Sequence, residues 1–179
     1  FGDTNKLSVT VVRYGNVLGS RGSVIPFFNK QFKEKKYVTV THKAMTRFSI
    51  FLEEGVNAVL WSIKNAKGGE IIVPKAPSMN IIDLAKVIAG KKIKIVGKRP
   101  GEKVSEELIS SNESINAIDL GKYYAILPVS NYNRTLNFYK KKFKIKKFPA
   151  IESYNSEQNN IFLSQSDIKQ ILKKLDFYF

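Results

Sequence analysis

The sequence contains no cysteine and a single histidine, His42. The lack of cysteine excludes disulfide bonds and thiolate metal sites, and a single histidine argues against a metal site built on imidazole ligands. No apolar run approaches the roughly 18 residues that a membrane-spanning helix requires, so we expect no membrane partner. No signal peptide opens the chain, which favours a cytoplasmic location. Because the first residue is Phe1 rather than Met, we expect the chain to be a piece of a longer protein.

Acidic residues are scarce relative to basic ones: 15 Asp and Glu stand against 30 Lys and Arg, giving a net charge of +15. Such a balance favours a nucleic-acid partner. Most of these cations are lysines in an Asn- and Ile-rich chain, however, a bias that AT-rich coding produces by itself. The five arginines are Arg13, Arg21, Arg47, Arg99 and Arg134. Three of them lie in glycine- or proline-containing loops or at a strand edge.

Arginine is the more informative cation because its planar fork grips two phosphate oxygens at once. The placement of the arginines therefore indicates a discrete anionic ligand, and nucleic acid is the less favoured partner. A basic nucleic-acid-binding module remains the alternative from a different functional class. It rests partly on the lysines and aromatics interleaved in Tyr139–Phe148, which we read as a solvated basic strand or loop.

Strands and helices are predicted to alternate along the chain, which indicates an α/β fold. A length of 179 residues is enough for one domain or a domain and a half. The predicted strands are Leu7–Tyr14, Tyr37–Thr41, Arg47–Phe51, Glu70–Pro74, Ile93–Val96 and Tyr123–Pro128. The predicted helices are Val24–Lys36, Leu52–Ala66, Ile81–Ala89, a short one around Ser105–Ser110, and Gln165–Leu175. The polar, basic stretch Asn131–Asn160 is predicted to be irregular.

Three helix starts carry capping signals. Ser23 is the expected N-cap of the helix that begins at Val24. Asn80 with Asp83, and Ser164 with Asp167, have the spacing of capping boxes.

The stretch "VVRYGNVLGSRGSVIPFF" combines a β-branched run, three glycines within eight residues and a helix-like apolar run. Strand, glycine loop and helix is an arrangement that presents backbone N–H groups to a phosphate. The glycine spacing is not that of the dinucleotide fingerprint G-x-G-x-x-G, so this is not the first turn of a nucleotide-binding fold.

Five motifs occur in one order over nearly the whole chain. They are "RYGNVLGSRGSVIPFF", "MTRFSIFLEEGV", "GGEIIVPKAPSM", "RPGEK" and "YNSEQNN". Together they resemble the C-terminal half of the UDP-N-acetylglucosamine 4,6-dehydratases, in the extended short-chain dehydrogenase/reductase superfamily. The resemblance is to the C5-inverting type of the pseudaminic acid pathway, within polysaccharide biosynthesis.

This resemblance implies the last parallel strands of a Rossmann-like fold together with a small α/β substrate-binding domain. Residues 1–22 and 47–75 are then expected to be the remnant of the NADP-binding sheet. Residues 23–46 and 76–130 are expected to bind a UDP-sugar, and 131–179 to form a basic extension with a terminal helix. Full-length proteins of this kind are expected to form homo-oligomers.

The reaction that the resemblance implies is an internal redox cycle on UDP-N-acetylglucosamine. Hydride leaves C4 of the hexose for NADP+, water is eliminated across C5–C6, and hydride returns to C6 to give a 4-keto-6-deoxy sugar. Such enzymes carry a catalytic Tyr-x-x-x-Lys, yet none of the eight tyrosines here has lysine four positions later. We therefore expect this chain to contain no catalytic residue and to be inactive alone.

The resemblance assigns Val17, Leu18, Gly19, Ser20 and Arg21 to the segment that lines the cofactor. It assigns Asn16, Arg47, Arg99 and Glu102 to the substrate. Each assignment has a structural alternative. Asn16 can be a turn residue that satisfies its own backbone, and Arg47 a surface arginine at a strand edge.

The pair Arg99 and Glu102 has the clearest chemistry. Pro100-Gly101 fixes a turn that we expect to hold both side chains on one side of a loop. A cationic fork for the diphosphate beside a carboxylate acceptor for ribose hydroxyls suits a UDP-sugar. The alternative is a surface ion pair of little energetic weight.

Three positions depart from the family pattern and place the exact substrate in question. Phe51 stands where threonine is usual and removes a helix cap, at a cost of about 1 kcal/mol. Ser49 replaces a usual aromatic, and Ser105 a common histidine. A C5-retaining dehydratase or a sugar-nucleotide epimerase of the same fold therefore stays open as an alternative.

Overall fold

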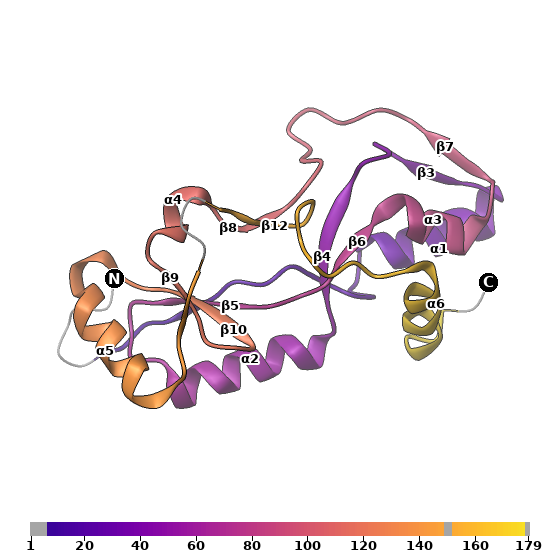
Figure 1. Ribbon diagram of the computed structural model, residues 1–179. Coiled ribbons are helices and arrows are strands. Elements are labelled where there is room, and N and C mark those ends of the chain that lie inside the picture. The colour runs from indigo at the N-terminus through magenta and orange to yellow at the C-terminus, as the bar shows by residue number, and fades with distance from the viewer. Residues whose placement is uncertain (1–6, 149–151, 178–179) are drawn as a thin grey trace. The chain divides into compact units, whose positions relative to one another are not determined.

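A computed structural model describes residues 7–148 and 152–177, and its elements are labelled in Figure 1. The predicted α/β class is confirmed, since helices accompany both parallel and antiparallel strands. The chain divides into two compact units, which we describe separately. Unit 1 takes the described residues of Phe1–Tyr14, Leu52–Lys75 and Glu107–Asn155, and unit 2 takes those of Gly15–Phe51, Ala76–Glu106 and Ser156–Phe179.

Unit 1 is built on a five-stranded sheet in the order β1-β5-β10-β9-β11. These strands are β1 (Val11–Val12), β5 (Ile71–Pro74), β10 (Tyr123–Ile126), β9 (Ala117–Asp119) and β11 (Lys146–Lys147). Only β1 and β5 run parallel. A second pair joins β8 (Glu107–Ile109) to β12 (Tyr154–Asn155). The helices are α2 (Leu52–Asn65), α4 (Ser111–Ser114), α5 (Tyr132–Lys142) and the 3₁₀ turn η1 (Val129–Asn131).

Unit 2 contains a three-stranded sheet, β2-β4-β6, and a parallel pair, β3 with β7. These strands are β2 (Asn16–Val17), β4 (Thr46–Ile50), β6 (Ser78–Asn80), β3 (Val38–Val40) and β7 (Ile93–Ile95). The helices are α1 (Val24–Lys35), α3 (Ile81–Ala89) and α6 (Gln165–Lys174).

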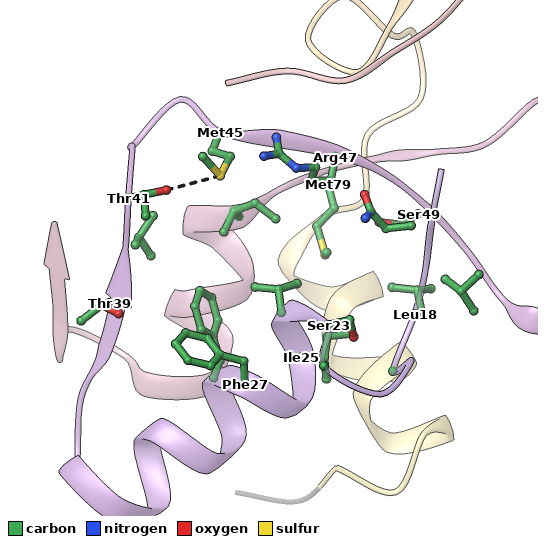
Figure 2. A pocket seen from close by; sticks show the side chains of 18 of the residues that line it. Leu18, Ser23, Ile25, Phe27, Thr39, Thr41, Met45, Arg47, Ser49 and Met79 are labelled. Carbon is green, nitrogen blue, oxygen red and sulfur yellow. Dashed lines mark hydrogen bonds between the residues drawn. The ribbon is translucent and has the colours of Figure 1, made fainter. Parts of the chain in front are cut away.

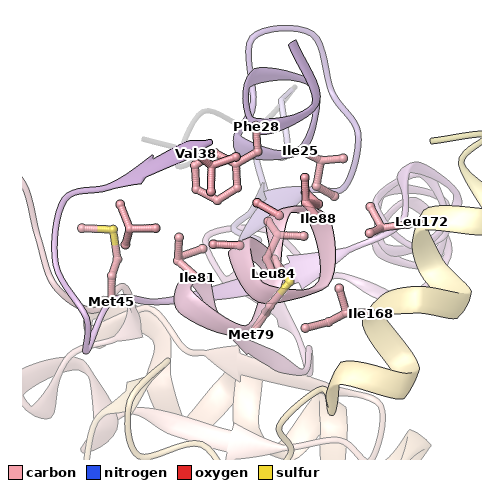
Figure 3. Packing of buried hydrophobic residues seen from close by; sticks show 13 residues of the cluster. Ile25, Phe28, Val38, Met45, Met79, Ile81, Leu84, Ile88, Ile168 and Leu172 are labelled. Carbon is pink, nitrogen blue, oxygen red and sulfur yellow. The ribbon is translucent and has the colours of Figure 1, made fainter. Parts of the chain in front are cut away.

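Helix α3 is the centre of the unit 2 core, as Figure 3 shows. Leu84 of α3 is fully buried and lies in one cluster with Phe28 of α1 and Ile168 of α6. Isoleucines recur along α3 on several sides of the helix, which suits a helix packed against more than one neighbour. The three helices are thereby fixed around the strands that carry the site described below.

The predicted continuous strand Leu7–Tyr14 is wrong in extent, because pairing with β5 covers only β1 and the chain then passes to β2 in the other unit. Gly15 is the first residue of unit 2 after β1. A Cβ on Gly15 would overlap Phe48 of β4, so only glycine lets the two backbones approach so closely. The close approach brings Asn16 into register with Ser49 across the β2–β4 pair.

The predicted irregular region Asn131–Asn160 is also wrong, since it contains helix α5. The helix is held by a buried carboxylate: Tyr139 donates its hydroxyl to Glu70 at 2.7 Å, and both side chains are at most 1% exposed. Glu70 also accepts the backbone N–H groups of Lys67 and Gly68, each at 2.6 Å. Burial, then the Glu70 bond, raises the pKa of Tyr139, so the phenol stays a donor. The sequence alone did not indicate this helix, because the lysines in its last turn are typical of a solvated basic segment.

Two local predictions at helix starts are wrong. The expected helix around Ser105–Ser110 is instead strand β8, and the helix α4 begins after Ser110, which forms a capping box with Glu113. At α3 the N-cap Asn80 makes no side-chain capping bond, and the Asp83 carboxylate accepts from Lys86 and Gln165 instead of from the Asn80 N–H. The capping box predicted at Ser164 and Asp167 is confirmed, and the resulting bonds from Ser164 lower the pKa of Asp167.

Helix α2 is confirmed, but its apolar stripe does not face the core. Small residues, Gly55, Ala58 and Ser62, are its buried positions, and the helix contacts β5 and β1. The stripe Leu52, Val56, Val59, Leu60 and Ile63 is exposed, up to 75% at Ile63. Over residues 7–148 and 152–177, no helix is both long enough and apolar enough to span a bilayer.

We predict that the ion pair between Arg13 and Glu113 makes unit 1 sensitive to acid. Arg13, followed by Ser110, lowers the pKa of Glu113 to about 2 from an ordinary 4.5. Stability from this pair is complete above about pH 4.5 and is lost as pH falls toward 2. Glu113→Gln should therefore cost about 1–2 kcal/mol at neutral pH, allowing for solvent screening of a pair about one-third exposed, and nothing near pH 2.

Urea unfolding at a series of pH values measures this difference. The matched control is Glu107→Gln on β8, an exposed carboxylate without an ion pair in the described part of the chain. A constant difference between wild type and Glu113→Gln from neutral pH to about pH 2 would contradict the prediction.

Candidate functional site

Unit 2 contains a pocket of about 390 Å³, within the range of ligand sites (Figure 2). Its walls come from β2, the start of α1, β3, β4, and the loop after β7. The lining includes Asn16, Val17, Leu18, Gly19, Gly22, Ser23, Val24, Ile25, Phe27, Phe28, Thr39, Val40, Thr41, Met45, Arg47, Ser49, Met79, Ile81, Arg99 and Glu102. Its apolar residues belong largely to the unit 2 core. The polar residues of the pocket are therefore supported by well-packed side chains.

The N-terminus of α1 forms one wall of the pocket. The first turn contains no acidic residue, and Lys33 and Lys35 lie in the last turn, so the helix dipole presents its positive end here. Ser23 is the N-cap, as predicted, but its hydroxyl makes no capping bond. The Ser23 Oγ atom is buried and has no hydrogen-bond partner among the described residues. A buried hydroxyl without a partner beside open helix N–H groups fits an oxygen-rich anion.

The loop after β7 contributes Arg99 and Glu102 through a tight turn. The N–H of Glu102 donates to the Arg99 carbonyl at 3.1 Å, with Pro100 second and Gly101 third in the turn. Gly101 has φ of +77°, the value that a type II turn requires at its third residue. The turn brings both side chains to the pocket, as the sequence predicts.

The Glu102 carboxylate is oriented by two donors. One oxygen accepts the Thr41 hydroxyl at 3.0 Å and the other accepts the Arg99 N–H at 3.1 Å. The backbone bond from Arg99 is the main cause that lowers the pKa of Glu102, so the group is a carboxylate at neutral pH. Each oxygen keeps a lone pair for a further donor such as a hydroxyl.

Arg47 uses most of its donors within the protein. One terminal nitrogen donates to the carbonyls of Thr46 at 2.7 Å and Val104 at 3.0 Å, and the other donates to Lys103 at 2.8 Å. Nε lies 3.4 Å from a Glu106 carboxylate oxygen, and the side chain is 15% exposed. By contrast, the Arg99 side chain has no hydrogen bond or ion pair among the described residues. Arg99 is therefore the more available cation of the pocket.

Seven of the nine residues assigned to cofactor and substrate lie around this one pocket. They are Asn16, Val17, Leu18, Gly19, Arg47, Arg99 and Glu102. Ser20 and Arg21 are exposed and lie outside the lining.

The segment expected to line NADP offers contact surface and few free backbone donors. Val17, Leu18 and Gly19 reach the pocket wall, but the N–H groups of Leu18 and Ser20 already donate to backbone carbonyls. The segment can therefore supply contact surface and few backbone bonds. No cluster of metal-ligating side chains occurs within the described ranges.

Two further residues that line the pocket, Ser23 and Thr41, are not predicted from the sequence as part of the site. Ser23 was identified only as a cap, and the cap that fails to form is visible only in three dimensions. Thr41 had no sequence signal, since its bond to Glu102 spans 61 positions.

Two of the departures from the family pattern have structural explanations. Ser49 is a pocket residue opposite Asn16 and is 2% exposed, so its small side chain leaves room in the pocket. The Lys174 ammonium of α6 lies 4.2 Å from the ring centre of Phe51, a cation–π contact that threonine could not make.

Known proteins resemble this chain closely. A "UDP-glucose 4-epimerase" from Rickettsia bellii is 41% identical over 179 residues, which cover 97% of this chain and 51% of that protein. A "UDP-N-acetylglucosamine 4,6-dehydratase (inverting)" from Campylobacter jejuni is 41% identical over 167 residues, covering 90% and 50%. The chain spans about half the length of these relatives.

A crystal structure described as Pen from Bacillus thuringiensis superposes with a TM-score of 0.79 at 32% identity, covering 96% of this chain and 50% of that one. The family described as polysaccharide biosynthesis protein matches residues 2–128. The relatives thus confirm the resemblance to sugar-nucleotide dehydratases and epimerases, and the chain belongs to the polysaccharide biosynthesis protein family.

Proposed function

We propose that this chain is the UDP-sugar-binding part of a C5-inverting UDP-N-acetylglucosamine 4,6-dehydratase. The observation that carries the proposal is the single pocket in which the open N-terminus of α1, the partnerless Ser23 hydroxyl and the available Arg99 occur together. Helix N–H groups and an arginine fork are complementary to a diphosphate. The C. jejuni relative bears the name of this activity.

The diphosphate is proposed to lie between α1 and Arg99. The N–H groups of Val24 and Ile25 belong to the first turn, where an α-helix has no internal acceptors for them. Arg99 supplies the bidentate cation, and Arg47 offers its one remaining N–H while it holds the loop. In this assignment both arginines contact the substrate, but Arg99 makes the bidentate contact and Arg47 contributes a single N–H.

The remaining polar groups suit the sugars. Glu102 can accept ribose hydroxyls, because its two oriented oxygens keep free lone pairs. Asn16 presents an amide at the mouth of β2 for the hexose. Phe27 is 47% exposed at the pocket and offers an aromatic face to a base or sugar ring.

NADP+ would supply the hydride acceptor and donor of the internal redox reaction. Val17, Leu18 and Gly19 would form the contact surface on its nicotinamide side, with Ser20 and Arg21 at the solvent margin. What the residues of this chain do is bind and orient the substrate, which is a large part of what a positioned reaction requires.

The chain is proposed to need further polypeptide for turnover. It lacks the Tyr-x-x-x-Lys pair, and it spans about half of its relatives. The exposed stripe of α2 and the edge strand β1, where Val11 is half exposed, give additional polypeptide an apolar surface to cover. The complete enzyme is proposed to be a cytoplasmic homo-oligomer that starts pseudaminic acid synthesis.

An epimerase is the second candidate, because the R. bellii relative with that name is as similar as the dehydratase. The pocket groups described above would bind a UDP-hexose in either case. The two reactions differ in product mass, since only the dehydratase releases water.

We predict that the 179-residue chain binds UDP and UDP-N-acetylglucosamine by isothermal titration, and that Arg99→Ala weakens UDP binding about 10- to 100-fold. The reason is the loss of a charge-assisted bond to the diphosphate. Arg99→Lys should recover only part of the affinity, because an ammonium cannot bind in a bidentate manner. Arg134→Ala, which removes an exposed arginine of α5 in unit 1, is the matched control and should leave Kd unchanged.

Absence of UDP binding by the folded wild-type chain would refute the proposal. Tight binding of a fluorescent single-stranded oligonucleotide that UDP does not compete for, with a steep dependence on salt, would support the nucleic-acid module instead.

We predict turnover only after complementation. The chain should be co-expressed with the part of the C. jejuni relative that it does not cover, and incubated with UDP-N-acetylglucosamine and NADP+. The expected product is a 4-keto sugar lighter than the substrate by one water, with inverted C5 by proton NMR. A product of unchanged mass would identify an epimerase, retained C5 would identify the retaining dehydratase, and turnover by the chain alone would contradict the requirement for a second part.

A further inference from the structure

A serine outside the pocket is joined to the loop that carries Arg99 and Glu102. Ser156 lies in the motif "YNSEQNN", for which sequence analysis offered no role, and it is the first residue of the last segment of unit 2. Its side chain is fully buried and does not line the pocket. Its hydroxyl therefore cannot contact a ligand there.

The Ser156 hydroxyl joins two backbone segments. Its oxygen accepts the Glu106 N–H at 2.8 Å and lies 2.8 Å from the Thr46 hydroxyl. Its proton can be donated to the Thr46 carbonyl at 3.2 Å, while the Thr46 hydroxyl donates to Ser156 Oγ. The backbone N–H of Ser156 donates to the Glu106 carbonyl at 2.8 Å. The serine hydroxyl therefore donates one hydrogen bond and accepts two, which is its full capacity.

Arg47 binds the same two segments from the pocket side. Its guanidinium reaches the Thr46 carbonyl, the Lys103 and Val104 carbonyls, and the Glu106 carboxylate. A backbone bond from Thr46 N to Val104 O at 2.9 Å also joins the two segments. The end of the 97–106 loop is therefore fixed to the start of β4 by a buried hydroxyl pair and by a guanidinium.

The position of the Arg99 turn depends on where this loop ends. Among the residues that the structure describes, one side-chain bond, from Thr41 to Glu102, ties the turn at residues 99–102 to the rest of the pocket. The chain on either side gives further support: the Val96 N–H donates to the Val40 carbonyl at 3.0 Å before the turn, and residues 103–106 follow after it. A small displacement of a charged fork lowers the strength of a bidentate bond, because both hydrogen bonds need the correct geometry.

We propose that Ser156 is a positioning residue for the nucleotide-sugar site. Its hydroxyl, together with that of Thr46, fixes the end of the 97–106 loop so that Arg99 meets the diphosphate. The inference rests on the proposed function, since it presumes a diphosphate ligand. It assigns to the "YNSEQNN" segment a task in substrate affinity, without contact to substrate.

The test measures UDP affinity in a double-mutant cycle, using the 179-residue chain and UDP as the probe. Ser156→Ala should weaken UDP binding about five- to tenfold at temperatures where the variant is folded. In the Arg99→Ala background the same change should alter Kd by no more than about twofold, because the fork that Ser156 positions is already absent. A merely structural serine would not show this dependence on Arg99.

Matched variants separate positioning from stability. Ser114→Ala removes a hydroxyl that is equally buried but lies in unit 1, where it donates to Ser111 at 2.6 Å, and should lower stability without changing UDP affinity. Thr46→Val removes the second hydroxyl at nearly constant volume and should reproduce the affinity loss of Ser156→Ala. If Ser156→Ala does not fold, Thr46→Val and its cycle with Arg99→Ala give the same test.

Wild-type affinity in folded Ser156→Ala, or an equal loss in both backgrounds, would overturn the positioning role while the Arg99 effect preserves the proposed function. If the wild-type chain does not bind UDP, the proposed function and this inference fail together. Weaker binding that depends on Arg99, with an inert Ser114→Ala, supports the proposal.

Discussion

The hold of Arg47 on backbone carbonyls is the constraint on which the site depends. Its guanidinium connects the start of β4 to residues 103 and 104, and with Glu106 it leaves one N–H uncommitted. A lysine could not replace it, because three carbonyls and a carboxylate around one side chain need a planar fork with several donors. The loop that carries Arg99 and Glu102 has no regular strand or helix between β7 and β8, so such side-chain bonds, with the backbone bonds of Val104 and Glu106, hold it at the pocket.

Arg47 and Arg99, which the sequence assigns alike to the substrate, thus have different roles. Arg47 is mostly enclosed and supports the loop, whereas Arg99, on that loop, keeps its guanidinium available. Two hydroxyls differ in the same way: that of Ser156 is fully hydrogen-bonded within the protein, whereas the buried Ser23 Oγ atom at the pocket has no partner among the described residues. Residue type and motif position could not separate these roles, because the bonds that occupy Arg47 and Ser156 reach partners more than fifty positions away.

The sequence was sufficient where local chemistry decides the outcome. The Pro100-Gly101 turn, the α2 helix and the Ser164 capping box all follow from residues within a few positions of each other. It was insufficient where a long-range contact decides. Helix α5 depends on Tyr139 reaching Glu70, and β8 depends on pairing with β12, 45 or more positions away. The resemblance to a family predicted which residues lie together at the pocket. It could not show which of them already use their hydrogen-bonding groups within the protein.

The excess of positive charge does not explain the pocket. None of the described residues that line it is a lysine, although lysines make up most of the 30 cations of the chain. The two pocket arginines are offset by Glu102 and Glu106, so the local balance is close to neutral. An extended polyanion would gain most from the lysine-bearing surface outside the pocket, where salt screens each contact. A compact diphosphate would gain from the pocket, because directed N–H groups and one available arginine fork lie around it together. The distribution of donors, more than the total charge, therefore favours a sugar nucleotide over a nucleic acid.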